Sequence, residues 1–122
     1  MTVAAKLQIR AASTVVVLGR PSGMDLEIPP ECLVTSDADD AARADAVVAF
    51  VVRATDLDAV GAPALEAARE DRLAWLVYPK NRQLGTDLNR DTLAALAIER
   101  GAQPVRQVAV DAVWSALRFR PA

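Results

Sequence analysis

The chain has 122 residues, of which 52% are hydrophobic and 25% are charged, and its formal net charge is −2, a balance typical of one folded domain with a single core. Its basic residues are scattered, its first residues contain no apolar stretch of signal-peptide length, and no apolar run reaches the ~20 residues of a membrane span, so we expect a cytoplasmic protein that binds neither nucleic acid nor membrane. The absence of histidine and the single cysteine, Cys32, exclude Ser-His-Asp and Cys-His catalysis, an intrachain disulfide and thiolate metal cages, and we predict no catalytic residue and no metal site.

The amino-terminal third of the chain predicts two strands with little between them. Residues 13–19 form a continuous β-branched run that ends in glycine, which is typical of a parallel strand buried on both faces. Residues 32–35 predict a weaker second strand. The short spacing and Pro29-Pro30 leave room for at most one helical turn between these strands, around residues 24–26.

A strong third strand is predicted over residues 46–52, and a helix follows it. Apolar residues recur at helical spacing from Leu57 to Ala68, and Thr55 with Asp58 matches a capping box. Gly61, followed closely by a proline, predicts a bend in this helix.

A fourth strand is predicted over residues 73–78, because Pro79 has no amide hydrogen with which to continue a strand ladder. Asn89 is a suitable cap for a second helix, which carries apolar residues on one face. Gly101 suits the left-handed position that ends such a helix.

The last part of the chain predicts an antiparallel hairpin. A fifth strand covers residues 105–110, a short loop covers residues 111–114, and a sixth strand runs through Phe119. Strands alternating with helices imply right-handed crossovers and a mainly parallel sheet. We therefore predict an α/β, Rossmann-like domain over residues 1–122, with helices on both faces and six strands in the order 2-1-3-4-6-5, strand 6 being antiparallel.

A pattern of unlike residues at particular spacings extends over nearly the whole chain. Its residues are Lys6, Leu7, Gly19, Pro21, Gly23, Trp75, Pro79, Lys80, Gly85, Thr86, Asp87, Leu88, Asp111, Trp114, Ser115, Leu117 and Phe119. This pattern resembles a family of short bacterial proteins of unknown function, with a departure at Ser13, where glycine is expected. The order of elements also resembles a truncated class I S-adenosylmethionine methyltransferase, whose parallel sheet ends in an antiparallel hairpin. The resemblance implies a methyltransferase-like fold and brings no established reaction with it.

The loop after the first strand, Gly19-Arg20-Pro21-Ser22-Gly23, lies where open α/β sheets hold their ligands. A dinucleotide or S-adenosylmethionine loop needs closely spaced glycines and a following helix, so that backbone amides approach the ligand. Neither is present here. We therefore favour a tight turn shaped by Pro21 and Gly23, and ligand binding by Gly19, Arg20, Ser22 and Gly23 is the alternative.

Asp37 follows the second strand, about where Rossmann proteins place the carboxylate that accepts hydrogen bonds from ribose hydroxyls. However, Asp37, Asp39 and Asp40 directly precede residues 41–44, which fits the acid-rich first turn of a short helix. We favour the helix cap, and ribose binding is the alternative.

Strands four and five are predicted to run parallel and to end at one edge of the sheet. Polar residues and a tryptophan gather in the loops of that edge: Lys80, Asn81, Arg82, Thr86, Asp87, Asp111, Trp114 and Ser115. One interpretation is a basic cleft for a carboxylate or phosphate, with Trp114 as a stacking wall. The other, which we favour, is structural: Lys80 pairs with Asp87 or Asp111, Trp114 covers the sheet end, and Thr86 orders the start of the next helix.

Three hypotheses for function follow. The first is a non-catalytic binding or regulatory module without a cofactor, on a degenerate methyltransferase-like scaffold, with a homodimer through a sheet edge or helix face as one arrangement. The second is a small transferase that binds S-adenosylmethionine or a nucleotide. The third is a protein–protein interaction module whose partner covers the edge near Trp114.

Overall fold

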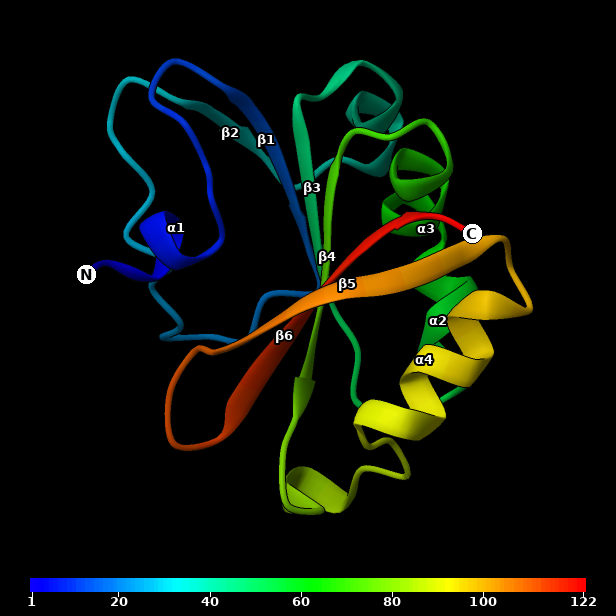
Figure 1. Cartoon of the computed structure of the whole chain (residues 1–122). Coiled ribbons are helices and arrows are strands. Elements are labelled where there is room, and N and C mark those ends of the chain that lie inside the picture. The colour runs from blue at the N-terminus through cyan, green and yellow to red at the C-terminus, as the bar shows by residue number, and fades with distance from the viewer.

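The computed structural model describes residues 1–122, and one mixed six-stranded sheet in the order β2-β1-β3-β4-β6-β5 forms its centre (Figure 1). Strands β2, β1, β3 and β4 run parallel, whereas β6 is antiparallel to both β4 and β5. The α/β class, the strand order and the antiparallel β6 confirm the prediction. The strands are β1 (Thr14–Leu18), β2 (Leu33–Thr35), β3 (Ala46–Phe50), β4 (Leu73–Pro79), β5 (Ala102–Ala109) and β6 (Trp114–Pro121).

The three central strands, β1, β3 and β4, are buried along almost their whole length. Side chains on one face, such as Val16 and Leu76, belong to one apolar cluster, and those on the other face, such as Val15 and Trp75, belong to a second. Because both faces are covered, these strands are continuous apolar runs rather than alternating ones.

Helices cover the first face, and Figure 1 shows α2, α3 and α4 together on one side of the sheet. The helix predicted after β3 is divided into two at Gly61, where the bend was expected, and a Cβ at Gly61 would lie 2.9 Å from the carbonyl oxygen of Leu57. None of these helices combines the length and the hydrophobicity that a membrane-spanning helix requires. The elements on this side are η1 (Ala38–Arg43), α2 (Asp56–Ala59), α3 (Ala62–Arg69) and α4 (Arg90–Ile98). The short η2 (Gln83–Gly85) lies in the connection between β4 and α4 and buries no residue.

The predicted capping box at the start of α2 is wrong. Thr55 already has helical backbone angles, and its side chain makes no capping hydrogen bond. Instead Asp56 Oδ2 accepts hydrogen bonds from the amides of Val52 and Arg53, at 2.9 Å each. A cap residue needs extended backbone to aim its side chain at the first turn, and Thr55 lacks it.

The second face is covered by the one-turn helix α1 (Val3–Lys6) and by irregular chain that contributes Leu26. Helices therefore lie on both faces as predicted, but the second face has only the single turn of α1. The indole Nε1 of Trp75 donates to the carbonyl oxygen of Leu7 at 2.8 Å, which fastens the amino-terminal segment to β4. No helix lies between β1 and β2, within the predicted limit of one turn.

The helix before the final hairpin begins and ends as predicted. The Asn89 side chain accepts a hydrogen bond from the Thr92 amide at 2.8 Å, and Gly101 has a φ of +85°. Strand β5 begins three residues earlier than predicted, because Pro104 lies on the sheet edge, beside a register shift between Pro104 and Arg106. An edge position tolerates proline since no neighbouring strand needs its amide.

Candidate functional site at the carboxyl edge of the sheet

The carboxyl ends of β1, β3 and β4, together with the turn between β5 and β6, form the edge at which the predicted site residues lie. The structure does not unite these residues in one cleft. Most of them line three separate depressions, one beside the end of β1, one between the first loop and the final hairpin, and one at the start of α4, whereas Asp37, Lys80 and Ser115 line none of the three.

The depression beside β1 has a volume of about 460 Å³ and includes Gly19 and Arg20. Gly19 has a φ of +70°, and a Cβ added there would lie 2.8 Å from the carbonyl oxygen of Phe50. This glycine therefore allows the chain to approach β3. Arg20 Nη1 donates to the carbonyl oxygen of Met24 at 3.3 Å, across the turn that contains Ser22 and Gly23.

The same loop does not fit S-adenosylmethionine in the manner that a methyltransferase-like fold implies. The close backbone approach at Gly19 is made to the protein's own Phe50 rather than to open space. No helix begins after Gly23 to direct its amides toward a charged ligand. We therefore derive no chemistry through that cofactor.

Asp37 is the cap of η1 and does not line the depression beside β1. Its Oδ1 accepts from the Asp39 amide at 2.9 Å, while its own amide donates to Thr35 Oγ1 at 2.9 Å. The Thr35 hydroxyl in turn donates to Asp40 Oδ2 at 2.9 Å. This confirms the favoured interpretation of the acidic run as a helix start.

The residues of the hairpin turn hold the end of the sheet together. Asp111 Oδ1 accepts from the amides of Val113 and Trp114, at 2.8 Å each. The Trp114 residue is 6% exposed, and its ring makes an edge-to-face contact with Phe50, with ring centroids 5.3 Å apart. Trp114 thus covers the sheet end and presents little surface to a stacking ligand or a partner.

Ser115 is also buried, and its hydroxyl donates to the carbonyl oxygen of Val108 at 3.3 Å. The depression between the hairpin and the first loop has a volume of about 340 Å³. Its lining includes Ser22, Gly23 and Trp114 together with the carboxylates of Asp25 and Asp111, and no cationic side chain. This depression does not have the charge that an anionic ligand requires.

Thr86 and Asp87 fasten the loop after β3 to the start of α4. The Thr86 hydroxyl donates to the carbonyl oxygen of Val52 and accepts from the Leu88 amide at 3.0 Å. Asp87 Oδ1 accepts from the Ala54 amide at 2.9 Å, and its Oδ2 lies 3.3 Å from Arg53 Nη2. Thr86 therefore orders the segment before α4, which agrees with the structural interpretation of this residue.

Lys80 forms an ion pair with neither of its predicted partners, since Asp87 pairs with Arg53 and Asp111 caps the hairpin. The Lys80 backbone amide instead donates to the carbonyl oxygen of Val113 at 2.8 Å. Arg82 is exposed, has a φ of +59°, and lines the depression at the start of α4, whose volume is about 550 Å³.

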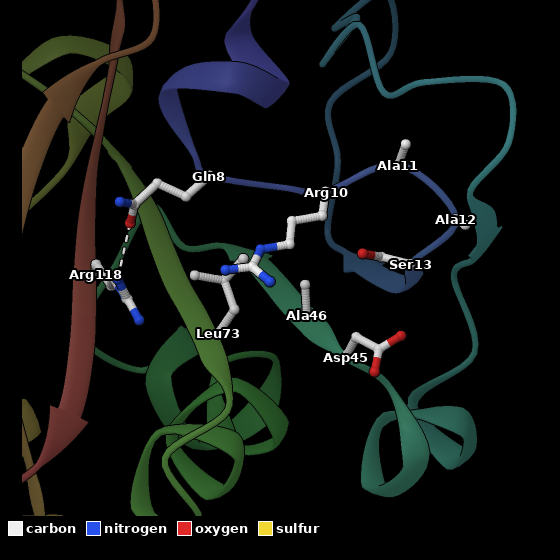
Figure 2. Close-up of a pocket in the computed structure, with 9 residues that line it drawn as sticks. All are labelled: Gln8, Arg10, Ala11, Ala12, Ser13, Asp45, Ala46, Leu73 and Arg118. Atoms are coloured by element: carbon white, nitrogen blue, oxygen red, sulfur yellow. Dashed lines mark hydrogen bonds between the residues drawn. The ribbon is translucent and has the colours of Figure 1, made fainter.

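A further depression, at the opposite edge of the sheet, was not anticipated from the sequence. It has a volume of about 500 Å³ and lies beside the starts of β1, β3 and β4 (Figure 2). Its lining side chains come from four segments far apart in the chain, so no local sequence motif indicates it. They are Gln8, Arg10, Ala11, Ala12, Ser13, Asp45, Ala46, Leu73 and Arg118.

The carboxyl edge therefore holds loops in place and leaves shallow depressions between them. Its carboxylates and hydroxyls are mostly engaged with backbone groups, either of their own turn or of a neighbouring segment. No three side chains of the cysteine, aspartate and glutamate type converge where they could hold a metal ion. Comparison with known proteins finds neither a protein-family model nor a curated protein that matches this chain.

Proposed function

We propose that the chain is a non-catalytic binding or regulatory module built on a degenerate methyltransferase-like scaffold. The strand order supports the scaffold, because the antiparallel strand β6 lies between β4 and β5, as in the fold that the sequence resembles. The missing helix between β1 and β2 is consistent with a shortened form of that fold.

The observation that carries the proposal is the internal use of polar side chains at the carboxyl edge. A catalytic acid or base must lie within hydrogen-bond reach of the proton that it moves. Here Thr86 and Asp87 direct their oxygens at backbone groups of the loop after β3, and Asp111 directs an oxygen at amides of its own turn. Such an edge can present a fixed surface, whereas its acceptors are not aimed at a reacting group.

A transferase that binds S-adenosylmethionine or a nucleotide is the second candidate. The depression beside Gly19 favours it, because this depression opens at the carboxyl ends of β1 and β2, where open α/β sheets hold ligands. Ser36 supplies a hydroxyl group on its wall, whereas the neighbouring Thr35 hydroxyl is engaged with Asp37 and Asp40.

Thermal unfolding in the presence of S-adenosylmethionine, its demethylated product and common nucleotides distinguishes the two candidates. The proposed module shows no saturable stabilisation by any of them. A transferase is stabilised as ligand concentration rises, by about 2.7 kcal/mol at a hundredfold excess over Kd, and that result would overturn the proposal. The variant Ser36→Tyr, which fills the depression at an exposed position, is then expected to abolish the stabilisation, whereas Ser22→Tyr in the neighbouring depression leaves it unchanged.

A further inference from the structure

We propose that the depression at the amino edge of the sheet binds a small organic anion through Arg10 and Arg118. This site lies at the opposite edge from the one where α/β folds hold their ligands, so analogy with the fold does not account for it. The inference goes beyond the function proposed above and does not depend on whether the carboxyl edge binds a cofactor.

The first observation is an unpaired buried donor. Arg118 lies on β6, opposite Trp75 of β4, and its Nη1 donates to Gln8 Oε1 at 2.8 Å. Its Nε is buried and has no hydrogen-bond partner, the only side-chain nitrogen or oxygen of the molecule in that condition. A cationic group that is desolvated and lacks an acceptor for one of its donors is unfavourable. Because Arg118 lines the depression, an anion bound there would offset the positive charge of this guanidinium group.

The second observation is the charge around the depression. Arg10 forms no ion pair, and Figure 2 shows its side chain reaching over Leu73 toward the side on which Arg118 lies. The nearby carboxylates are engaged elsewhere: Asp45 Oδ2 accepts from the Thr14 amide at 2.8 Å, and Asp71 makes two hydrogen bonds to Arg120, at 2.8 and 3.0 Å. Neither guanidinium group forms an ion pair, and Arg118 acts on Asp71 only as one of the positive charges that lower the pKa of that carboxyl. With Asp45 as the one carboxylate in the lining, the two arginines leave the depression with a net positive charge.

The third observation is the shape of the wall that carries Gln8 and Arg10. Gln8 has a φ of +62° and Ala12 a φ of +64°, both in the left-handed region that side chains rarely adopt. The two residues turn the segment around the depression and bring Ser13 to its rim.

The lining indicates the chemistry of the ligand. Guanidinium groups bind carboxylates and phosphates through parallel hydrogen bonds. A volume of about 500 Å³ suits a small molecule rather than a polymer, and the Ala11, Ala46 and Leu73 side chains provide an apolar surface. The ligand class is therefore a small metabolite that joins a carboxylate or phosphate group to a short hydrocarbon part.

Titration of ¹⁵N-labelled protein with inorganic phosphate and, separately, with succinate tests the proposal, with sodium chloride holding the ionic strength constant. Saturable shifts are expected at residues 8–13, at Asp45 and Ala46, and at the Arg118 Nε–H signal. The anion that binds with the lower Kd shows whether the site prefers phosphate or carboxylate. Shifts that rise linearly for both probes, or that fall only at the carboxyl edge, would overturn the proposal.

Three variants locate the binding site. Arg10→Gln and Arg118→Gln are each expected to weaken binding of the better probe about tenfold or more, as for loss of a hydrogen bond to a charged group. Arg90→Gln, at the start of α4, removes the same charge far from the depression and leaves Kd unchanged. Arg10 is exposed and its side chain makes no hydrogen bond, so Arg10→Gln keeps the fold even if Arg118→Gln does not. Unchanged affinity in Arg10→Gln would contradict the assignment.

Discussion

Two glycines in the loop after β1 share a left-handed backbone but meet different surroundings. The φ angle is +70° at Gly19 and +81° at Gly23. A Cβ at Gly19 would lie 2.8 Å from the Phe50 carbonyl oxygen, whereas a Cβ at Gly23 would meet nothing within 4 Å. Gly23 is therefore needed for its backbone conformation alone, and Gly19 for its conformation and for close packing.

The variant Gly19→Ala is expected to lower the free energy of unfolding by about 2–5 kcal/mol, because overpacking against a backbone oxygen adds to left-handed strain. Gly23→Ala is the matched control and introduces the strain alone, at about 1 kcal/mol. Urea denaturation of both variants measures the difference. Equal losses would mean that the contact with Phe50 is relieved without cost.

Two exposed carboxylates have a pKa below its ordinary value of 3.8. The largest cause is in each case a hydrogen bond from an arginine, Arg100 for Asp58 and Arg120 for Asp71. A carboxylate whose pKa is depressed in the folded state adds stability above its unfolded-state pKa, and this stability is lost as the pH falls through the folded-state pKa. Solvent screening keeps each contribution small.

The double variant Asp58→Asn/Asp71→Asn is therefore expected to be less stable than the parent chain at pH 7. The difference should shrink as the pH falls below about 4. Urea midpoints measured between pH 7 and pH 2.5 follow this change, with Glu66→Gln as a control at a residue that forms no ion pair. A difference that stays constant over this range would refute the assignment to these two pairs.

At the scale of elements, side chains from two segments hold the loop that joins β3 to α2. Asp56 accepts from two amides of this loop, and Asp87 accepts from a third. The Thr86 hydroxyl bridges the Val52 carbonyl oxygen and the Leu88 amide. The end of β3 is in this way coupled to the start of α4 through polar contacts as well as through the apolar cluster that Val51 and Leu88 share.

The variant Thr86→Val keeps the side-chain shape but leaves both groups bridged by the hydroxyl without that partner. We expect the free energy of unfolding to fall by about 1–3 kcal/mol, as for an unsatisfied polar group in a buried site. Thr92→Val, on the exposed face of α4, is the matched control and should change it by less than about 0.5 kcal/mol. Thermal or urea unfolding compares them, and a Thr86→Val effect as small as that of the control would show that the bridge contributes nothing.

At the scale of the whole molecule, one sheet separates two apolar clusters with different coverings. Both tryptophans, Trp75 and Trp114, belong to the cluster beneath α1. Helices α2, α3 and α4 lie on the other face, where they contribute most of the helical residues. Tryptophan fluorescence and far-ultraviolet circular dichroism therefore report on opposite sides of the molecule.

Because β1, β3 and β4 contribute to both clusters, we expect the two signals to change together in one cooperative transition. Urea titration followed by both methods on one sample tests this. If fluorescence changes at a lower urea concentration, the thinly covered face opens first as a separate unit.

Much of the fold could be predicted because its strands, helix ends and turns have recognisable local sequence patterns. Continuous apolar runs, Pro79, Asn89 and Gly101 placed the central strands and the helix before the hairpin, and short connections restricted the strand order. The one-turn helix α1 escaped prediction, because four residues are too few to show a helical period. The capping box failed because the backbone at Thr55, and not its side chain, decides whether it can cap.

By itself, the sequence determined the α/β class, the six strands and the edge where polar residues gather, because hydrophobic spacing and turn chemistry are properties of neighbouring residues. Only the tertiary structure decided which polar groups are engaged, since their partners lie far along the chain. Asp87 meets an amide 33 positions away, and Gln8 meets Arg118 at a separation of 110. Long-range contacts of this kind engage polar side chains at the carboxyl edge of the sheet. At the amino edge, the Nε of Arg118 has no hydrogen-bond partner.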